Sequence, residues 1–213
     1  YVNDRNGENA IIVVPGAAAG IGPADVDAAA DAIRSAAVFV TQLESPVAAA
    51  KRGLEVARRA GVTTIFNPAP AEPVEDEIFP LCDYVTPNEH EAATLTGVAV
   101  AGVDDARRAG DVFLARGART ALITLGANGA LLHTTGRSVH IPAFDAGPVG
   151  ETAGAGDAFN GAFAAALARG REPDEAVRFA CAAAGISVTR PGTAPSMPSL
   201  GEIEALLGRR KAG

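Results

Sequence analysis

Short β-branched segments alternate with helix-forming, alanine-rich segments along the first part of the chain. Strands are expected at residues 10–14, 38–43, 62–66, 83–86 and 120–125. Strands separated by helices form parallel sheets with right-handed crossover connections. The alternation therefore predicts an α/β fold built on a mainly parallel sheet.

Turn-forming residues mark where the expected helices begin and end. A helix is expected to follow Gly22-Pro23, because proline suits the first turn of a helix. Ser45 is expected to cap the next helix and Pro46 to open it, and Gly61 stops it after residue 60. A further helix at 104–116 leads into the apolar strand at 120–125, which is typical of a strand buried on both faces.

The pattern changes after Gly126. Residues 130–133 and 138–141 flank the turn T-T-G-R, which predicts a β-hairpin. Helices are then expected at 157–168, 173–188 and about 200–207. Because no repeat, linker or shift in composition divides the chain, residues 1–213 are expected to form a single domain.

The composition excludes several functional classes. With 48% hydrophobic and 20% charged residues, the chain can bury a core. A net charge of −7 disfavours nucleic acid and anionic membranes as partners, and no apolar run is long enough to cross a bilayer. Cys82 and Cys181 are far apart and lack metal-ligand spacing, which favours reduced thiols in the cytoplasm over a disulfide framework or a transition-metal site.

A glycine-rich turn that leads directly into a helix is the strongest functional signal. It has the sequence E-T-A-G-A-G-D-A-F-N-G, residues 151–161. Small residues let a ligand reach consecutive backbone N–H groups, and a helix N-terminus adds unpaired donors, so the turn favours an anion such as phosphate. Asp157 could then take a proton from an attacking hydroxyl. Alternatively, the glycines let a buried helix pack closely and Asp157 only caps it.

Four further candidate sites follow the ends of expected strands, where open parallel sheets bind ligands. They are Glu44, the Asn67-Pro68-Ala69-Pro70 turn, Asn88 with Glu91, and the loop at 126–129.

Each of these sites also has a purely structural interpretation. Glu44 could accept hydrogen bonds from a polyol, but an acid at a helix N-terminus needs no ligand. Asn88 and Glu91 share one helical face and could hold a hydrated Mg²⁺, or they form a cap and a solvated acid. The T-L-G-A-N-G loop at 124–129 could offer its backbone to a nucleotide, or it is a tight turn into the hairpin.

Three common motifs are absent from the sequence. It contains no G-x-x-x-x-G-K-[ST], no G-x-G-x-x-G after an early strand and no G-x-S-x-G. A P-loop NTPase, a Rossmann dinucleotide site and the usual α/β-hydrolase are therefore not expected.

Several motifs, in this order, resemble one known family. N-P-A-P, T-P-N-E-x-E, I-T-L-G-x-x-G, E-T-A-G-A-G-D-A-F-N-G-A-F and V-T-R-P-G-T-A-P-S are similar to those of the ribokinase (PfkB) family of carbohydrate kinases, over nearly the whole chain. The resemblance implies a ribokinase-like three-layer α/β/α fold.

The resemblance also implies an activity, the ATP-dependent phosphorylation of a sugar's primary hydroxyl. Ribose is the favoured substrate, giving D-ribose 5-phosphate and ADP. Asp157 matches the family's general base, Gly154, Ala155 and Gly156 match its anion hole, and Glu44 matches an acid that contacts the sugar. Asn88 matches a nucleotide contact, and Glu91 matches an acid that binds Mg²⁺ through water. The other matching nucleotide positions are Thr124, Leu125, Gly126, Ala127, Asn128, Gly129, Gly156 and Cys181.

Family members are further activated by a monovalent cation, K⁺. The matching positions here are Glu151, Ala153, Ser187, Arg190, Gly192 and Ser196. Glu151 departs from the aspartate that is usual in the family, and its extra methylene moves a ligand oxygen by about one bond.

The part of the family pattern that precedes Tyr1 is missing, including strands, a lid and a sugar-binding aspartate. We therefore expect the chain to be the C-terminal two-thirds of a kinase whose complete form is a homodimer. The missing strands should leave an apolar sheet edge bare. Two alternatives stay open: a sibling kinase that acts on fructose, a nucleoside or another furanose, and a nucleotide-binding or oligomerising fragment without turnover.

Overall fold

The computed structural model describes residues 12–209, and the chain divides into two compact units. The sheet unit contains Val14–Gly126 and Ala130–His140. The helical unit contains Ala127–Gly129 and the chain from Ile141 onward, together with the residues before Val14. The expectation of one domain over residues 1–213 stays a prediction.

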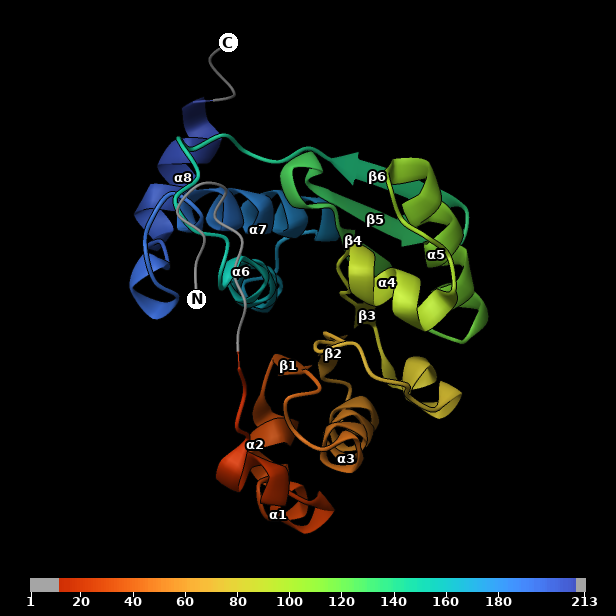
Figure 1. Ribbon diagram of the computed structural model, residues 1–213. Helices are drawn as coiled ribbons and strands as arrows, with labels where there is room; N and C mark the ends of the chain where they lie inside the picture. The colour runs from red at the N-terminus through yellow and green to blue at the C-terminus, as the bar shows by residue number, and fades with distance from the viewer. Residues whose placement is uncertain (1–11, 210–213) are drawn as a thin grey trace. The chain divides into compact units, whose positions relative to one another are not determined.

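Six strands form one sheet in the order β1-β2-β3-β4-β5-β6 (Figure 1). The first four strands, β1 to β4, are parallel, and β5 is antiparallel to β4. The mainly parallel sheet and the hairpin are therefore as predicted. The strands are β1 (Val38–Thr41), β2 (Thr63–Phe66), β3 (Tyr84–Val85), β4 (Ala121–Thr124), β5 (Ala130–Thr134) and β6 (Arg137–Ile141).

Helices of the sheet unit cover the sheet and enclose one apolar cluster. In this cluster α3 supplies Leu54 and α5 supplies Phe113, against Phe66, Val85 and Ile123 of the strands. All five side chains are fully buried. The helical elements are η1 (Gly16–Gly20), α1 (Pro23–Ala28), α2 (Ala30–Ser35), α3 (Val47–Arg59), η2 (Asp76–Leu81), α4 (Glu89–Thr96) and α5 (Val103–Ala115).

Two local predictions in the first part of the chain are wrong. Of the strand expected at 10–14, residues 10 and 11 lie outside the described residues, and residues 12–14 are exposed and form no strand. A β-branched run becomes a strand only where a neighbour satisfies its backbone, and none of the six strands pairs with it. Ser45 does not cap α3, because the helix begins one residue later, after Pro46, without a side-chain cap. As expected, Gly61 follows the end of α3, and its φ of 74° is the left-handed conformation that commonly terminates a helix.

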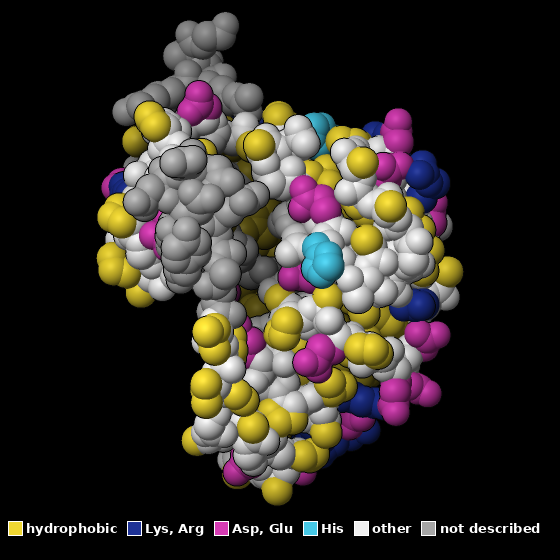
Figure 2. Space-filling view, in the orientation of Figure 1, with side chains coloured by type: hydrophobic (Ala, Val, Ile, Leu, Met, Phe, Trp, Pro, Cys, Tyr) yellow, Lys and Arg dark blue, Asp and Glu magenta, His cyan; other side chains and the backbone are white. Residues whose placement is uncertain are grey.

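Strand β1 lies at one edge of the described sheet, and Val40 on it is 41% exposed. On the face shown in Figure 2, apolar side chains are also exposed over the region of α1 and α2. Val14 and Ile21 are large exposed apolar residues of the same unit. Val40 is thus an apolar side chain exposed on the edge strand, and the expectation of a bare apolar sheet edge stays a prediction.

The helical unit is built on a close pair of helices, α6 (Ala155–Ala168) and α7 (Pro173–Ser187). Small residues of α7, including Ala180 and Ala183, are buried, and the rings of Phe159 and Phe163 on α6 lie 6.4 Å apart. The unit also contains η4 (Ala194–Ser196) and α8 (Leu200–Arg209), and η3 (Gly126–Asn128) lies at the boundary of the two units. The predicted helices are thus confirmed to within about two residues at their boundaries. Within residues 12–209, no helix is long and apolar enough to cross a membrane.

Candidate functional site

The predicted site residues fall into both units, and each group is described within its own unit. The helical unit contains the glycine-rich turn and the loop that follows α7, and the sheet unit contains Glu44, Asn88, Glu91 and residues 124–126.

The glycine-rich turn begins α6 with Gly154 as its N-terminal cap residue. Gly154 has a φ of 77°, a left-handed conformation that favours glycine, and a Cβ there would lie 3.2 Å from the Thr193 side chain. The amide of Ala155 donates to the carbonyl of Thr152 at 3.2 Å. The amides of Gly154 and Gly156 have no acceptor among residues 12–209. Two of the three predicted donors are therefore available to an anion.

Gly156 is not a packing glycine. It is exposed, and no atom lies within 4 Å of the position that its Cβ would occupy. Asp157 lies in the first turn of α6 and is also exposed, so its side chain is not turned into the protein interior. The close-packing alternative therefore does not account for Gly156, and the positions of both residues suit an anion site at the start of α6.

A second segment, residues 188–196, is hydrogen-bonded to the segment before the turn. Glu151 Oε2 accepts the Gly192 amide at 2.7 Å. The amides of Gly150 and Glu151 both donate to the carbonyl of Val188, at 2.8 and 3.2 Å. These bonds join the two segments directly ahead of the predicted anion donors.

The other residues predicted to bind a cation lie at or near these two segments. Ser187 ends α7 and donates its hydroxyl to the carbonyl of Ala184, and the buried Ser196 donates to the carbonyl of Thr193. Arg190 forms an ion pair with Glu202, and this pair, with the amide and hydroxyl of Ser199, lowers the pKa of Glu202 to about 2. The structure thus brings Glu151 and Gly192 together directly.

Cys181 lies on α7 and is buried. Burial raises the pKa of its thiol to about 12, so the side chain stays a neutral thiol at physiological pH. Cys82 is likewise buried, in the sheet unit. Both cysteines act as packing residues in this structure.

The Asn88 turn forms a closed hydrogen-bonding unit at the start of α4. Asn88 Oδ1 accepts the Glu91 amide at 2.8 Å, while the Asn88 amide and Nδ2 each donate to one oxygen of Glu91 at 2.9 Å. Glu91 is 8% exposed, and its burial raises the pKa of its carboxyl group. The pair is therefore a capping box with a buried acid, and the expectation of a solvated acid is wrong.

Glu89, the first residue of α4, is the acid of this turn that the sequence analysis left without a role. It is half-buried, and burial raises the pKa of its carboxyl group. A Cβ on Gly126 would lie 3.6 Å from Glu89 Oε1, so the carboxylate lies beside the backbone of the predicted nucleotide loop. Its place directly after Asn88 in N-E-x-E was the only signal in the sequence that could have identified it.

The loop that follows β4 combines accessible and purely structural positions. Thr124 donates its amide to the carbonyl of Pro87 at 3.0 Å, which ties the end of β4 to the Asn88 turn. Leu125 is buried, so only its backbone could meet a ligand. In the helical unit, a Cβ on Gly129 would lie 2.1 Å from the carbonyl oxygen of Ile141, so Gly129 is required by packing. The tight-turn interpretation therefore holds for Gly129. The backbone of Gly126 is still accessible to a nucleotide.

Glu44 and Asn67, the two remaining candidates, differ in whether their side chains are engaged in hydrogen bonds within the protein. Glu44 is exposed, and its amide donates to Gln42 Oε1 at 2.7 Å. Asn67 donates its Nδ2 to the carbonyl of Thr86 at 2.7 Å, which links the ends of β2 and β3. Asn67 thus has a structural role, and Glu44 stays free to meet a polyol.

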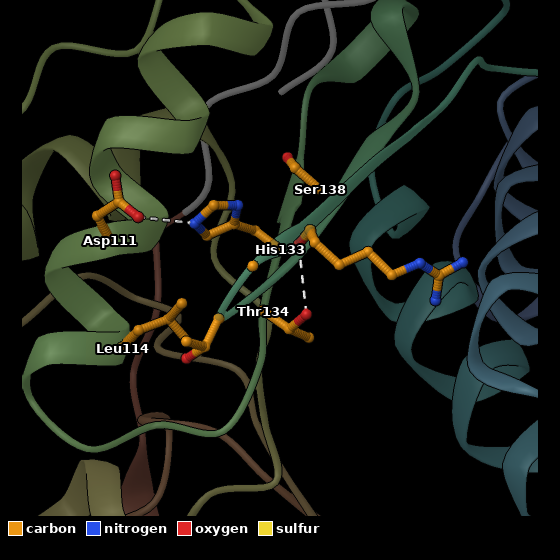
Figure 3. A pocket seen from close by; sticks show the side chains of 8 residues that line it. Asp111, Leu114, His133, Thr134 and Ser138 are labelled. Atoms are coloured by element: carbon orange, nitrogen blue, oxygen red, sulfur yellow. Dashed lines mark hydrogen bonds and ion pairs between the residues drawn. The ribbon is translucent and has the colours of Figure 1, made fainter.

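A surface cavity of ≈ 340 Å³ lies between α5 and the β5–β6 hairpin (Figure 3). His133 Nε2 lies 2.9 Å from Asp111 Oδ1, and a Cβ on Gly110 would lie 2.6 Å from His133 Cδ2. None of the predicted site residues lines this cavity. The pairing joins residues 22 positions apart, so no local pattern in the sequence could have indicated it.

Comparisons with known proteins match nearly the whole chain to one family. The sequence profile described as pfkB family carbohydrate kinase matches residues 1–200. The chain is 40% identical to a ribokinase from Haemophilus influenzae, over 92% of this chain and 63% of the relative. It is 35% identical to a deoxyribokinase from Salmonella typhi, over 97% of this chain and 67% of the relative.

A solved structure confirms the fold. The ribokinase of Arabidopsis thaliana, described in complex with ribose and ATP, has a TM-score of 0.87 at 31% identity, over 95% of this chain and 66% of that protein. The ribokinase-like α/β fold that the resemblance implied is therefore correct. The chain spans a little under two thirds of the length of the Haemophilus and Arabidopsis proteins.

Proposed function

Because the chain belongs to the pfkB family of carbohydrate kinases, we propose that the protein transfers the γ-phosphoryl group of ATP to the primary hydroxyl of a pentose. Ribose is the first candidate, with D-ribose 5-phosphate and ADP as the products. The ribokinase relative and the ribose and ATP complex of the Arabidopsis protein support this choice.

The observation that carries the proposal is the open turn at the start of α6. The amides of Gly154 and Gly156 lack acceptors among the described residues, and the exposed Asp157 lies in the first turn of the same helix. Backbone donors at a helix N-terminus stabilise the negative charge that develops on a transferring phosphoryl group. A carboxylate next to them can accept the proton of the attacking hydroxyl.

In this mechanism Asp157 removes the proton from the sugar hydroxyl as the oxygen attacks the γ-phosphorus in line with the leaving ADP oxygen. The amides of Gly154 and Gly156 hold the equatorial phosphoryl oxygens, which lowers the energy of the transition state. Ala155 contributes mainly by keeping the turn compact, because its amide is bonded to Thr152. Glu44 contacts the sugar.

The proposed nucleotide contacts come from Asn88 and from the loop at 124–129. Mg²⁺, when bound, neutralises charge on the nucleotide phosphates, and it takes oxygen ligands and retained waters. Glu91 would meet such a hydrated cation through a retained water, and the half-buried Glu89 lies in the same turn beside Gly126. Cys181, which the family resemblance places near the base, would contribute there as a buried neutral thiol.

A monovalent cation, K⁺, fits the joined segments in the helical unit. Its donors would be oxygen atoms of Glu151, Ala153, Ser187, Arg190, Gly192 and Ser196. One oxygen of Glu151 already accepts the Gly192 amide, so the longer side chain holds the two segments together itself. The chain's own residues therefore supply part of the bridging that the cation would provide.

Deoxyribose is the second candidate substrate, because a deoxyribokinase is 35% identical over 97% of this chain. Ribose and deoxyribose differ in one hydroxyl group. A site that hydrogen-bonds this hydroxyl rejects the analogue strongly, whereas a site that does not bond it accepts both. The ratio of kcat/KM for the two sugars, measured on one preparation with fructose and a nucleoside as further acceptors, decides between them.

The test of the proposed function is the Asp157→Asn variant. We expect kcat for ADP formation with ribose to fall by at least about 10²-fold, because the general base is lost. Nucleotide affinity should be retained. The matched control is Glu175→Gln, an exposed acid in the first turn of α7, which should keep wild-type turnover. Unchanged turnover in Asp157→Asn would contradict the mechanism, and nucleotide binding without turnover in the wild-type protein would favour a non-catalytic role.

A further inference from the structure

Asn160 is a polar residue on the buried side of α6, about one helical turn after the glycine-rich turn. It is 8% exposed, and its neighbours in the helix include the buried Phe159 and Phe163. Asparagine is a weaker helix former than alanine, and burying its amide costs free energy unless the amide is hydrogen-bonded. An asparagine at this position therefore disfavours the helix locally, which is typical of residues kept for function.

The side chain of Asn160 is hydrogen-bonded to the glycine-rich turn. Its Nδ2 donates to the carbonyl oxygen of Gly156 at 3.0 Å. A carbonyl oxygen can only accept, so the nitrogen and not the oxygen of the side-chain amide faces it. In a regular α-helix the same carbonyl also accepts the main-chain amide of the residue four positions later, which is again Asn160. One residue therefore offers two donors to the carbonyl of Gly156.

Gly156 depends on its backbone bonds for its position. It is exposed, and no atom lies within 4 Å of the position that its Cβ would occupy. Glycine also has the widest choice of backbone conformations. The carbonyl of Gly156 and the amide nitrogen of Asp157 belong to one planar peptide group. A second hydrogen bond to that carbonyl therefore restrains the peptide group from which Asp157 projects.

We propose that Asn160 is a positioning residue, which holds the peptide group between Gly156 and Asp157 and thereby keeps the Asp157 carboxylate in place for proton abstraction. The inference rests on the proposed function and adds to it a buried residue that acts through the backbone of the turn. Catalytic groups need support of this kind, because their productive geometry must be held to within about 0.5 Å.

A buried asparagine can also serve the helix alone, by filling space and bonding the carbonyl four residues before it. In that case its replacement would change the melting temperature and would leave the kcat of the folded variant at the wild-type value. The two roles therefore differ in kcat, and in whether the loss of kcat depends on Asp157.

The experiment measures steady-state phosphorylation of ribose and of deoxyribose by ATP in wild type, Asn160→Ala and Asn160→Ser. Alanine has no side-chain donor, whereas a serine hydroxyl in a helix can donate to the carbonyl four residues earlier, which is that of Gly156. Asn160→Leu, which has nearly the shape of asparagine, is a second variant without a donor. Asn160→Ala is also made in the Asp157→Asn background.

Phe163→Leu is the matched control for these variants. Phe163 is fully buried on the same helix, and its replacement removes volume without removing a hydrogen-bond donor. Thermal unfolding confirms that each variant is folded. Phe163→Leu should have a lower melting temperature and a wild-type kcat, which separates a loss of packing from a loss of positioning.

We expect Asn160→Ala and Asn160→Leu to lower kcat about tenfold with little change in KM for ATP, because a misplacement of about 1 Å can cost about 10²-fold in rate. Asn160→Ser should recover most of this loss. In the Asp157→Asn background the further loss from Asn160→Ala should largely disappear, because the carboxylate through which Asn160 acts is already gone.

Three outcomes would each overturn the inference and leave the proposed function intact. They are a wild-type kcat in the folded variants without a donor, an equal loss in Asn160→Ser, and a full further loss in the Asp157→Asn background. If wild type phosphorylates neither ribose nor deoxyribose, the proposed function itself is contradicted, and the inference with it.

Discussion

The turns that begin α4 and α6 both place an acid in the first helical turn, but they use their polar groups differently. In the Asn88 turn, the side chains of Asn88 and Glu91 satisfy each other, and the buried Glu91 has both oxygens engaged. In the Gly154 turn no side chain caps the helix, and the amides of Gly154 and Gly156 have no acceptor among the described residues. A turn that is satisfied internally stabilises the fold, whereas a turn with unpaired donors can bind an anion.

The largest effect is expected from removing one donor of the open turn. Gly156→Pro deletes the amide proton at a position in the first turn of α6, where proline is tolerated. We expect kcat to fall by about 10²-fold or more, the usual cost of one lost donor to a developing negative charge. Steady-state kinetics with ATP and ribose, on wild type and Gly156→Pro, measure this fall in kcat.

Gly161→Ala is the matched control for Gly156→Pro. Gly161 lies in the same helix, and no atom lies within 4 Å of the position of its Cβ. This variant should keep wild-type turnover and gain roughly 0.5–1 kcal/mol in the free energy of unfolding, because alanine favours a helix interior. If Gly156→Pro is folded and turns over as fast as Gly161→Ala, the open turn is not the catalytic anion site.

A smaller effect, on stability, is expected at the closed turn. Asn88→Ala removes the cap of α4 and leaves the buried Glu91 without its side-chain partner. The free energy of unfolding should fall by about 1–2 kcal/mol, measured by chemical denaturation.

Ser45→Ala is the control for the cap at Asn88. Ser45 precedes α3 without capping it, so its replacement should change the free energy of unfolding by less than about 0.5 kcal/mol. Equal losses in the two variants would show that the closed turn contributes no special stability.

The sequence predicted both turns but not how they differ. The alternation of strands and helices, the glycine at position 61 and the N-terminal cap at Asn88 are local signals, and all three are present in the structure. Burial of Glu91 depends on packing around α4, which no local pattern encodes, so the sequence left a solvated acid open as one interpretation.

Two misses have the same physical origin. Residues 12–14 have the composition of a strand, but a strand also requires a paired neighbour. The position of Glu89 beside Gly126, which is 37 positions away along the chain, likewise appears only in the folded chain.

The smallest effect concerns the segment that braces the open turn. Hydrogen bonds from Arg190 and from the amide and hydroxyl of Ser199 lower the pKa of Glu202 to about 2, below its ordinary value of 4.5. Because the folded state lowers this pKa, the stabilisation is complete above about pH 4.5 and is lost as the pH falls toward 2. Glu202→Gln should therefore flatten the dependence of the melting temperature on pH in this window. A slope equal to that of wild type would show that the contact does not stabilise the segment.

The central claim, that the amides of Gly154 and Gly156 bind the transferring phosphoryl group, can be tested directly by NMR of protein labelled with ¹⁵N-glycine. ADP, Mg²⁺, ribose and aluminium fluoride together mimic the transition state. We predict large shifts of the amide resonances of Gly154 and Gly156, while Gly192, whose amide is already bonded to Glu151, shifts little. Nucleotide binding that leaves Gly154 and Gly156 unshifted would contradict the account.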